Sequence, residues 1–541
     1  MTDPIPNTVS ALFKRAERHW PDRAMCEVMP RTAQVYGIEP GSISFRDAKA
    51  RIIEMRNVLI SAGFGSGMRV AVLLENRPDF FLWFIALNSI GASIVPINPD
   101  LRIAELEYLL GHAEPALVVA VPSRVAELQT AVTLANLDAK VILPSGDIPA
   151  PRLSAVVAHL TDDDNAREAA VLYTSGTTGK PKGCVLNNDY FTEVAKWYSG
   201  LGGIADLSED GERMITPLPI FHMNAMAYSF MAMLSVGGCL IALDRFHPRS
   251  WWDDVRDSRA TCLHYLGVMP TMLMGAAPSG QYQEHCVRFG FGAGIDPKIQ
   301  SAFEKRFNIP LVEGWAMTET GAGAVIAAHT SDRLIGKACM GRPADWLDTK
   351  LVDDAGQEVA QGEGGELLVR RKGDHPRRGF FAEYYKNPEA TTEAWQDGWF
   401  HTGDIVRQDV DGNMFFVDRK KNVIRRSGEN IAAVEVEAIL MRHPAIHAAA
   451  VAAVPDPLRG DEVFACLTVD DPKAEVAEEI TRWALGQMAY YKVPGFIAFV
   501  DALPLTSTQK IQRAQMKTLA LSLLDHPKTY NLCHMKKRQT A

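Results

Sequence analysis

A short polar loop between two apolar runs constrains this chain more than any other stretch. Residues 169–172 and residues 184–186 are apolar, and each run predicts a buried strand. Between them, residues 173–183 hold three glycines, two lysines and several hydroxyl side chains. Glycines let a backbone curl until its N–H groups point at one anion, while hydroxyls add donors and lysines add positive charge. The stretch therefore predicts a phosphate-binding loop.

This loop differs from the P-loop of NTPases. That motif has a glycine, four residues and then Gly-Lys-Ser/Thr at the start of a helix. Here Thr174 takes the place of the first glycine and Pro181 follows Lys180, so we expect the chain to run from strand to strand. Taken alone, the loop would also fit a flexible surface hairpin.

Strands and helices alternate on the N-terminal side of the loop. Apolar runs at 70–74, 94–97 and 117–121 predict strands, and helical spacing at 45–62 ends at Gly63. This alternation predicts an α/β fold with a largely parallel sheet that is buried on both faces. The chain becomes richer in predicted strands near residue 367, and a last α+β region begins near 419.

Charge and cysteine usage exclude several classes of function. A net charge of −9 argues against a nucleic-acid partner, which would want a basic face. The eight cysteines include no CxxC pair, so we expect neither a zinc site nor a disulfide framework, and a cytoplasmic setting. We see no secretory signal and expect no transmembrane segment, because the apolar stretches 80–95 and 228–243 are shorter than the roughly 20 residues a span needs.

Five motifs follow one another along the chain. They are Tyr173–Gly183, Gly314–Glu319, Trp399–Asp404, Asp418–Ile424 and Leu505–Ile511. Their order resembles the adenylate-forming enzymes, a superfamily of acyl-CoA synthetases, peptide-synthetase adenylation domains and firefly luciferase. The resemblance covers nearly the whole chain. It implies an acetyl-CoA synthetase-like α/β fold, with an N-terminal AMP-binding domain of stacked α/β layers plus a β-rich lobe (1–418) and a small mobile α+β lid (419–541).

The resemblance assigns a nucleotide site. Thr318 would hydrogen-bond the α-phosphate, Glu319 would hold Mg²⁺, Trp315 would offer an aromatic face to adenine where the family mostly has tyrosine, and Asp404 would accept two ribose hydroxyls. Arg419 would bind a phosphate or the ribose. The full set of implied ATP- and AMP-binding residues is Thr174, Ser175, Gly176, Thr177, Thr178, Gly179, Lys182, Gly292, Ala293, Gly294, Gly314, Trp315, Ala316, Met317, Thr318, Asp404 and Arg419.

The resemblance makes Lys510 the lysine that bridges the attacking carboxylate and the α-phosphate. A fixed ammonium in a dry site stabilises the charge that develops at phosphorus. Most family members have glycine before this lysine, whereas this chain has Gln509. Lys421 would be the hinge about which the lid turns, and Gly428, Glu429 and Asn430 would then line the CoA tunnel. Thr318 and Glu319 complete the implied catalytic set.

The acyl site rests on fewer residues. His222 follows Phe221 as in the Pro-Leu-Phe-His pattern of acyl-CoA synthetases, and we expect Asn224 and Gly321 in the wall of the acyl pocket, where Asn224 and His222 could hydrogen-bond a polar acyl group. Amino-acid adenylation domains typically have an aspartate in this segment, and none stands between Phe221 and Phe230, which disfavours an amino acid. The same segment and the hinge motif favour the crotonobetaine/carnitine-CoA ligase-like branch. Asn188 stands where many relatives have histidine.

Together these features predict an ATP-dependent acyl-CoA ligase of the AMP-forming acid–thiol type. Its partners would be a small carboxylic acid, ATP with Mg²⁺, and CoA; a homodimer is compatible with the sequence, which does not fix the oligomeric state. Three alternatives stay open: an adenylating enzyme that loads a separate carrier protein, a luciferase-like oxidase, and a nucleotide sensor without catalysis. A sensor would be expected to lose Glu319 or Lys510, and both are present.

Overall fold

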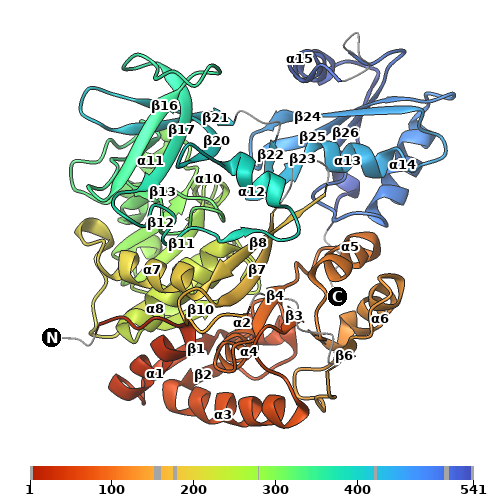
Figure 1. The fold of residues 1–541 in the computed structure, drawn as a ribbon. Helices are drawn as coiled ribbons and strands as arrows, with labels where there is room; N and C mark the ends of the chain where they lie inside the picture. The colour runs from red at the N-terminus through yellow and green to blue at the C-terminus, as the bar shows by residue number, and fades with distance from the viewer. Residues whose placement is uncertain are drawn as a thin grey trace.

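The computed structural model describes residues 4–151, 160–174, 180–277, 280–419, 423–504 and 511–537. Figure 1 shows a large N-terminal unit built on two α/β sheets, a β-rich lobe above it, and a small C-terminal unit beside that lobe.

The phosphate-loop strands belong to a seven-stranded sheet. Its order is β18-β8-β7-β4-β3-β5-β6, parallel from β7 to β6, with β8 and β18 antiparallel at the other edge. The inner strands are largely apolar because both faces are covered, and the buried polar residues at their starts, Arg69, Ser93 and Glu168, hydrogen-bond to one another. The strands are β3 (Arg69–Leu73), β4 (Ser93–Pro96), β5 (Leu117–Ala120), β6 (Lys140–Ile142), β7 (Glu168–Thr174), β8 (Lys182–Asn187) and β18 (Glu383–Tyr384).

A second, eight-stranded sheet carries most of the remaining nucleotide and acyl candidates. Its order is β14-β13-β12-β11-β9-β10-β1-β2, and it is parallel except at its two edge strands. The strands are β1 (Ala24–Val28), β2 (Gly41–Ser44), β9 (Arg213–Thr216), β10 (Cys239–Ala242), β11 (Cys262–Leu266), β12 (Phe289–Ala293), β13 (Leu311–Trp315) and β14 (Ile326–Ala327).

Helices cover both sheets. The helix at Phe45–Ala62 has the predicted bounds and ends at Gly63, whose φ of 99° favours glycine. The helix at Asp79–Asn88 is buried on every side, which explains why its sequence shows no polar face. The helices are α1 (Val9–His19), α2 (Pro30–Tyr36), α3 (Phe45–Ala62), α4 (Asp79–Asn88), α5 (Ile103–Ala113), α6 (Val125–Leu134), α7 (Asn188–Ser199), α8 (Phe230–Val236), α9 (Trp251–Asp257), α10 (Val268–Met274) and α11 (Pro297–Phe307).

The β-rich lobe is an antiparallel sheet of order β15-β21-β20-β17-β16, with β19 beside β20. It places the ribose-motif strand next to the strand that leads into the hinge motif. The elements are β15 (Cys339–Gly341), β16 (Leu347–Val352), β17 (Gly364–Arg371), α12 (Pro388–Ala394), β19 (Trp395–Gln396), β20 (Trp399–Gln408) and β21 (Met414–Arg419).

The C-terminal unit has its own sheet, of order β23-β22-β25-β26-β27 with β24 beside β25. One hydrophobic core runs through the large unit as far as Met414, and separate cores begin at Ile424 and Ala450. The elements are β22 (Val423–Arg426), β23 (Glu429–Ala432), α13 (Ala433–Leu440), β24 (Ala448–Asp456), β25 (Gly460–Thr468), α14 (Ala474–Leu485), β26 (Phe496–Phe499), α15 (Arg513–Leu523) and β27 (Thr529–Asn531).

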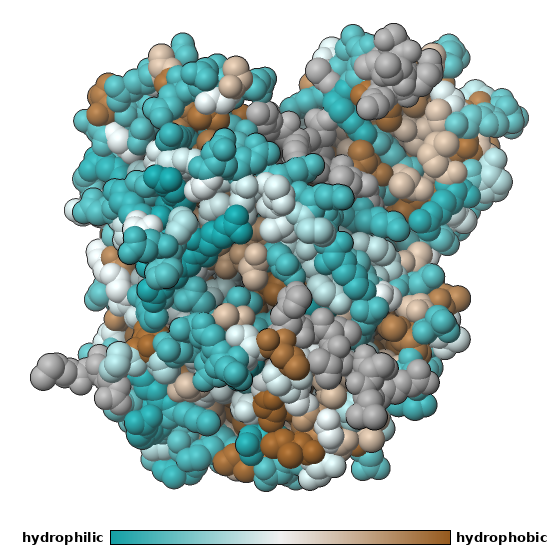
Figure 2. All heavy atoms as spheres, viewed as in Figure 1, coloured by the Kyte–Doolittle hydropathy of each residue, from teal (hydrophilic) through white to brown (hydrophobic). Residues whose placement is uncertain are grey.

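The predicted fold class is confirmed: two α/β sheets, a β-rich lobe and a small α+β unit. The domain boundary at 418/419 stays a prediction, which the separate cores support. Among the described residues, none of the helices has the length and hydropathy that crossing a bilayer requires. The face in Figure 2 is mostly hydrophilic, with hydrophobic residues in small groups and a notch between the β-rich lobe and the C-terminal unit.

Candidate active site

The phosphate loop connects two antiparallel strands, as the sequence predicts. Thr174 at the end of β7 lies opposite Lys182 at the start of β8. Ser175, Gly176, Thr177, Thr178 and Gly179 lie outside the described residues. The two ends of the loop are therefore fixed by strand pairing at the edge of the parallel part of the sheet.

Glu319 lies buried beside the end of this loop. The hydroxyl of Tyr384 donates a hydrogen bond of 2.8 Å to Glu319 Oε1. The ammonium of Lys182 lies 4.4 Å from the centroid of the Tyr384 ring. Tyr384 thus joins the candidate magnesium ligand to the phosphate loop. No motif marks this tyrosine, because it lies on a two-residue strand 65 positions after Glu319 in the sequence.

Trp315 and Asp404 form one buried pair. The indole Nε1 of Trp315 donates to Asp404 Oδ2 over 2.9 Å, and both side chains are almost fully buried. Thr402 Oγ1 accepts from the backbone N–H of Asp404 and donates to the carbonyl of Leu367. Trp315 therefore orients the carboxylate predicted to bind ribose. The sequence predicts an aromatic face at this position, and the hydrogen bond is a second role that only the packing reveals.

The backbone strip predicted to lie along adenine is held by a glutamate. Glu313 on β13 accepts hydrogen bonds from the backbone N–H groups of Gly294 and Ile295 and from the hydroxyl of Tyr265. Burial raises the pKa of Glu313 to about 7, although these hydrogen bonds oppose the rise. A side chain at Gly292 would collide with the carbonyl of Tyr265, so this strip requires glycine. Gly314 and Ala316 flank Trp315 directly, and Met317 follows them.

The acyl candidates gather at the end of β9. A loop follows β9, and a π-helical turn, Asn224–Ser229, leads from this loop into α8. Within it, the hydroxyl of Tyr228 donates to the carbonyl of Gly321 over 2.9 Å, which joins the turn to the segment that follows Glu319. The sequence predicts an apolar helix here and misses the π-helical start, which has no clear sequence signal.

The predicted CoA segment lies against the predicted acyl segment. Glu429 Oε1 is 3.1 Å from His222 Nε2, although the two residues are 207 positions apart. Burial would lower the pKa of His222, but the charge and hydrogen bond of Glu429 raise it above its ordinary value. Gly428 has a φ of 90°, and a side chain there would collide with Leu266 at the end of β11. Asn430 follows on β23.

The remaining predicted residues are placed in part. Arg419 lies opposite Asp404 in the ladder between β20 and β21. Thr318 precedes Glu319 and is half-buried. Lys421 and Lys510 lie outside the described residues.

Family profiles match both parts of the chain. The profile of the AMP-binding enzymes matches residues 13–381, and that of the AMP-binding enzyme C-terminal domain matches residues 435–510. The chain is an AMP-binding enzyme. The resemblance drawn from the five motifs is confirmed, and with it the enzyme class, an AMP-forming acid–thiol ligase of the acyl-CoA synthetase type.

Curated relatives and solved structures cover almost the whole AMP-binding enzyme. It is 30% identical to the crotonobetaine/carnitine–CoA ligases of Proteus mirabilis and Citrobacter koseri, over 90% of its own length and 96% of theirs. The structure resembles o-succinylbenzoate CoA synthetase from Bacillus subtilis, with a TM-score of 0.78 and 22% identity over 95% of this chain and 98% of that one. It also resembles the amide bond synthetase of Marinactinospora thermotolerans, with a TM-score of 0.79 and 22% identity over 94% and 99% of the two chains.

Further contacts dock the C-terminal unit of this AMP-binding enzyme on α5. Lys492 donates to Glu105 of α5 over 2.6 Å and to Glu435 of α13 over 2.5 Å, and all three side chains are buried. The backbone N–H of Ala489 donates to the second oxygen of Glu105. The sequence gives no sign of this bridge, because its parts come from two helices, α5 and α13, and from the loop at Lys492, which lie far apart in the sequence.

Proposed function

We propose that this enzyme activates a carboxylic acid with ATP and transfers the acyl group to CoA. In the first step a carboxylate oxygen attacks the α-phosphorus, the O–P bond forms, and the bond to the β-phosphate breaks and releases pyrophosphate. In the second step the CoA sulfur attacks the acyl carbonyl carbon. The C–S bond forms, the bond to AMP breaks, and the thiol proton passes to solvent. No covalent enzyme intermediate is needed, because the mixed anhydride is already activated.

The nucleotide residues support the first step. Thr174, Lys182 and Thr318 would bind phosphate oxygens, and Asp404, oriented by Trp315, would accept the ribose hydroxyls. The Glu319 carboxylate fits Mg²⁺, which prefers oxygen ligands and commonly uses one or two carboxylates together with phosphate oxygens. When bound, the ion would neutralise part of the charge on the departing pyrophosphate.

One observation carries the proposal that CoA is the acceptor. The segment Gly428–Asn430 lies at His222, and a fixed turn at Gly428 packs on Leu266. Helix α15 lies at the outer end of the C-terminal unit, whereas the β22–β23 hairpin faces the large unit (Figure 1). We infer that this is the orientation for thioester formation, and that Lys421 is the pivot that would bring Lys510 to the nucleotide for adenylation.

Pyrophosphate release across a panel of acids tests the first step. The panel would hold crotonobetaine and carnitine, for which the relatives are named, with short hydroxy acids, aromatic acids and medium-chain acids. We expect ATP-dependent release with a subset of them, followed by formation of an acyl-CoA. Release without a thioester, but with acyl transfer to a holo-carrier protein, would favour a carrier-loading enzyme. Oxygen consumption on adding ATP and acid would favour an oxidase.

Two variants separate the half-reactions. Lys510→Ala should abolish adenylation but spare thioester formation from synthetic acyl-AMP, because the lysine acts on the developing charge at phosphorus. Lys421→Pro should do the reverse, because a proline at the pivot blocks the rotation from the adenylation orientation to the thioester orientation. Lys528→Ala is the control, an exposed lysine of the same unit. Equal loss of both half-reactions in each variant would contradict the two-orientation account.

A further inference from the structure

A buried histidine stands behind the acyl candidate Asn224. His264 on β11 is fully buried. Its Nδ1 is 2.8 Å from both Asn224 Oδ1 and Ser229 Oγ, and its Nε2 is 2.9 Å from the hydroxyl of Tyr198. Burial lowers the pKa of His264 to about 3, so the ring is neutral at physiological pH, with one nitrogen donating and the other accepting.

The contacts of Tyr198 fix which nitrogen carries the hydrogen. Tyr198 is buried, and among the described residues His264 is the hydrogen-bond partner of its hydroxyl. The hydroxyl must donate to Nε2, because its hydrogen would otherwise lack an acceptor. Nδ1 then carries the ring hydrogen and donates to Oδ1 of Asn224, while the Ser229 hydroxyl donates to the Asn224 carbonyl. The direction of this series of hydrogen bonds also fixes which end of the Asn224 amide is oxygen and which is nitrogen.

The amide nitrogen of Asn224 consequently points away from His264. No described residue supplies an acceptor to this Nδ2 group, and Asn224 is half-buried. Aromatic rings lie next to this hydrogen-bonded group: the Phe291 ring centroid is 5.6 Å from that of His264 and 5.9 Å from that of Trp197. The hydroxyl of Tyr228 is already used by the carbonyl of Gly321. The turn therefore holds one oriented amide donor, close to a group of aromatic side chains.

We propose that Asn224, held by His264 and Tyr198, selects acids whose acyl chain carries a hydrogen-bond acceptor, such as a hydroxyl or carbonyl oxygen. The proposal rests on the proposed function. A plain hydrocarbon chain would cover the amide and leave its donors without a partner, which costs binding free energy, whereas an acceptor pairs with it. His264 is a positioning residue, because it acts through Asn224.

Matched pairs of acids test this selection. 3-Hydroxybutyrate is compared with 3-methylbutyrate, 4-hydroxybenzoate with 4-methylbenzoate, and 4-oxopentanoate with 4-methylpentanoate, by kcat/KM for pyrophosphate release. We expect the wild type to favour the oxygen-bearing acid about tenfold or more in at least one pair. Asn224→Leu, of similar size, should bring that ratio to about one, because leucine offers no hydrogen-bond donor to either acid. His264→Phe, which keeps a ring beside Tyr198, should lower the ratio partway.

Two more variants separate selection from folding. Asn224→Asp replaces the donor by an acceptor, so it should lose the preference for 4-oxopentanoate yet keep one for hydroxy acids, which can donate. Ser229→Ala leaves the Asn224–His264 bond in place and should keep the wild-type ratio. A wild-type ratio near one in every pair that releases pyrophosphate, or ratios unchanged in Asn224→Leu and Asn224→Asp, would overturn the inference. Absence of release from every acid would instead overturn the proposed function, and this inference with it.

Discussion

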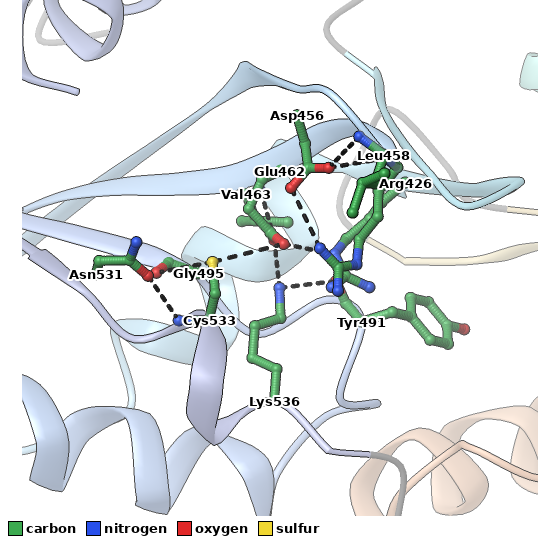
Figure 3. A network of polar contacts seen from close by, with 11 residues as sticks. Arg426, Asp456, Leu458, Glu462, Val463, Tyr491, Gly495, Asn531, Cys533 and Lys536 are labelled. Carbon is green, nitrogen blue, oxygen red and sulfur yellow. Dashed lines mark hydrogen bonds and ion pairs between the residues drawn. The ribbon is translucent and has the colours of Figure 1, made fainter. Parts of the chain in front are cut away.

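Two buried ionic networks that involve the C-terminal unit have opposite charge patterns. In the first, which we call the Glu462 network, one carboxylate binds two cations: Arg426 Nε donates to Glu462 over 2.8 Å, and Lys536 Nζ donates to its other oxygen (Figure 3). In the second, which we call the Lys492 bridge, one ammonium binds the two carboxylates of Glu105 and Glu435.

The opposite patterns have opposite effects on the lysines. Burial, assisted by the charge of Arg426, lowers the pKa of Lys536 to about 8 even though Glu462 opposes the change. Burial also acts to lower the pKa of Lys492, but its two carboxylates outweigh burial and raise that pKa. An ammonium shared between two carboxylates therefore stays charged, whereas one that shares a carboxylate with an arginine loses its proton more readily.

The two networks also differ in what they hold together. All members of the Glu462 network come from residues 426–536, so it forms when the C-terminal unit folds. It secures Arg426 at the turn end of the β22–β23 hairpin, where Arg426 lies directly opposite Glu429. The Lys492 bridge takes Glu105 from α5 of the large unit, so it forms only when the two units meet in this orientation. Buried ion pairs thus support the folding of the C-terminal unit in the Glu462 network and the relative orientation of the two units in the Lys492 bridge.

Glu462→Gln should give the largest effect. It leaves Arg426 and Lys536 buried without their shared carboxylate, and breaking a buried pair in this way costs about 3–5 kcal/mol. Denaturant unfolding would measure the loss. Asp470→Asn, which removes an exposed partner of His447, is the control and should change stability by about 0.5 kcal/mol or less. If both variants lost the same free energy of unfolding, burial would not be what makes the Glu462 pairs more stabilising than the exposed Asp470–His447 pair.

Lys492→Met should slow thioester formation from synthetic acyl-AMP by about tenfold or more and leave adenylation unchanged. The carboxylates of Glu105 and Glu435 would then face each other across the interface without a cation. The free-energy cost of this is smaller than for an ion pair that is always buried, because both carboxylates reach solvent when the units separate. Single-turnover assays of the two half-reactions would measure this. Lys473→Met, whose partner is the exposed Asp471, is the control. A parallel loss of adenylation would mean that the bridge stabilises the fold and not the orientation.

The titration of Lys536 should appear as a pH dependence of stability. An unfolded lysine has a pKa of about 10.4. Between pH 8 and about 10.4 the unfolded state binds more protons than the folded state, so the free energy of unfolding should rise with pH. We expect the wild type to gain roughly 1–3 kcal/mol relative to Lys536→Met between pH 8 and 10. A relative decrease over this range, measured by urea unfolding, would contradict the depressed pKa.

Tyr491→Phe should give the smallest effect. Asn98 of the large unit donates to the Tyr491 hydroxyl over 2.8 Å, a neutral hydrogen bond across the interface that the Lys492 bridge also crosses. Such a bond contributes about 0.5–1.5 kcal/mol, so we expect a two- to tenfold slower thioester step, less than for Lys492→Met. An effect larger than that of Lys492→Met would mean that charge is not what holds this orientation.

Local patterns predicted most elements of the fold correctly. The helix at Phe45–Ala62 and the strand-to-strand path of the phosphate loop follow from periodicity and from glycine and proline positions. The π-helical turn at Asn224–Ser229 was missed because apolar spacing does not separate it from an α-helix. Tyr384, Glu313 and His264 were missed as partners of site residues because each acts from another strand, with no motif around it.

The sequence by itself determined the α/β class, the order of the five motifs and the family, since these depend on residue type and spacing along one chain. Only the tertiary structure decided that Trp315 orients Asp404, that Glu429 meets His222, and that Lys492 joins two distant carboxylates. The physical reason is that hydrogen bonds and ion pairs require side-chain atoms within about 3 Å. For residues that lie far apart in the sequence, only the packing of the sheets and of the two units brings the side-chain atoms this close.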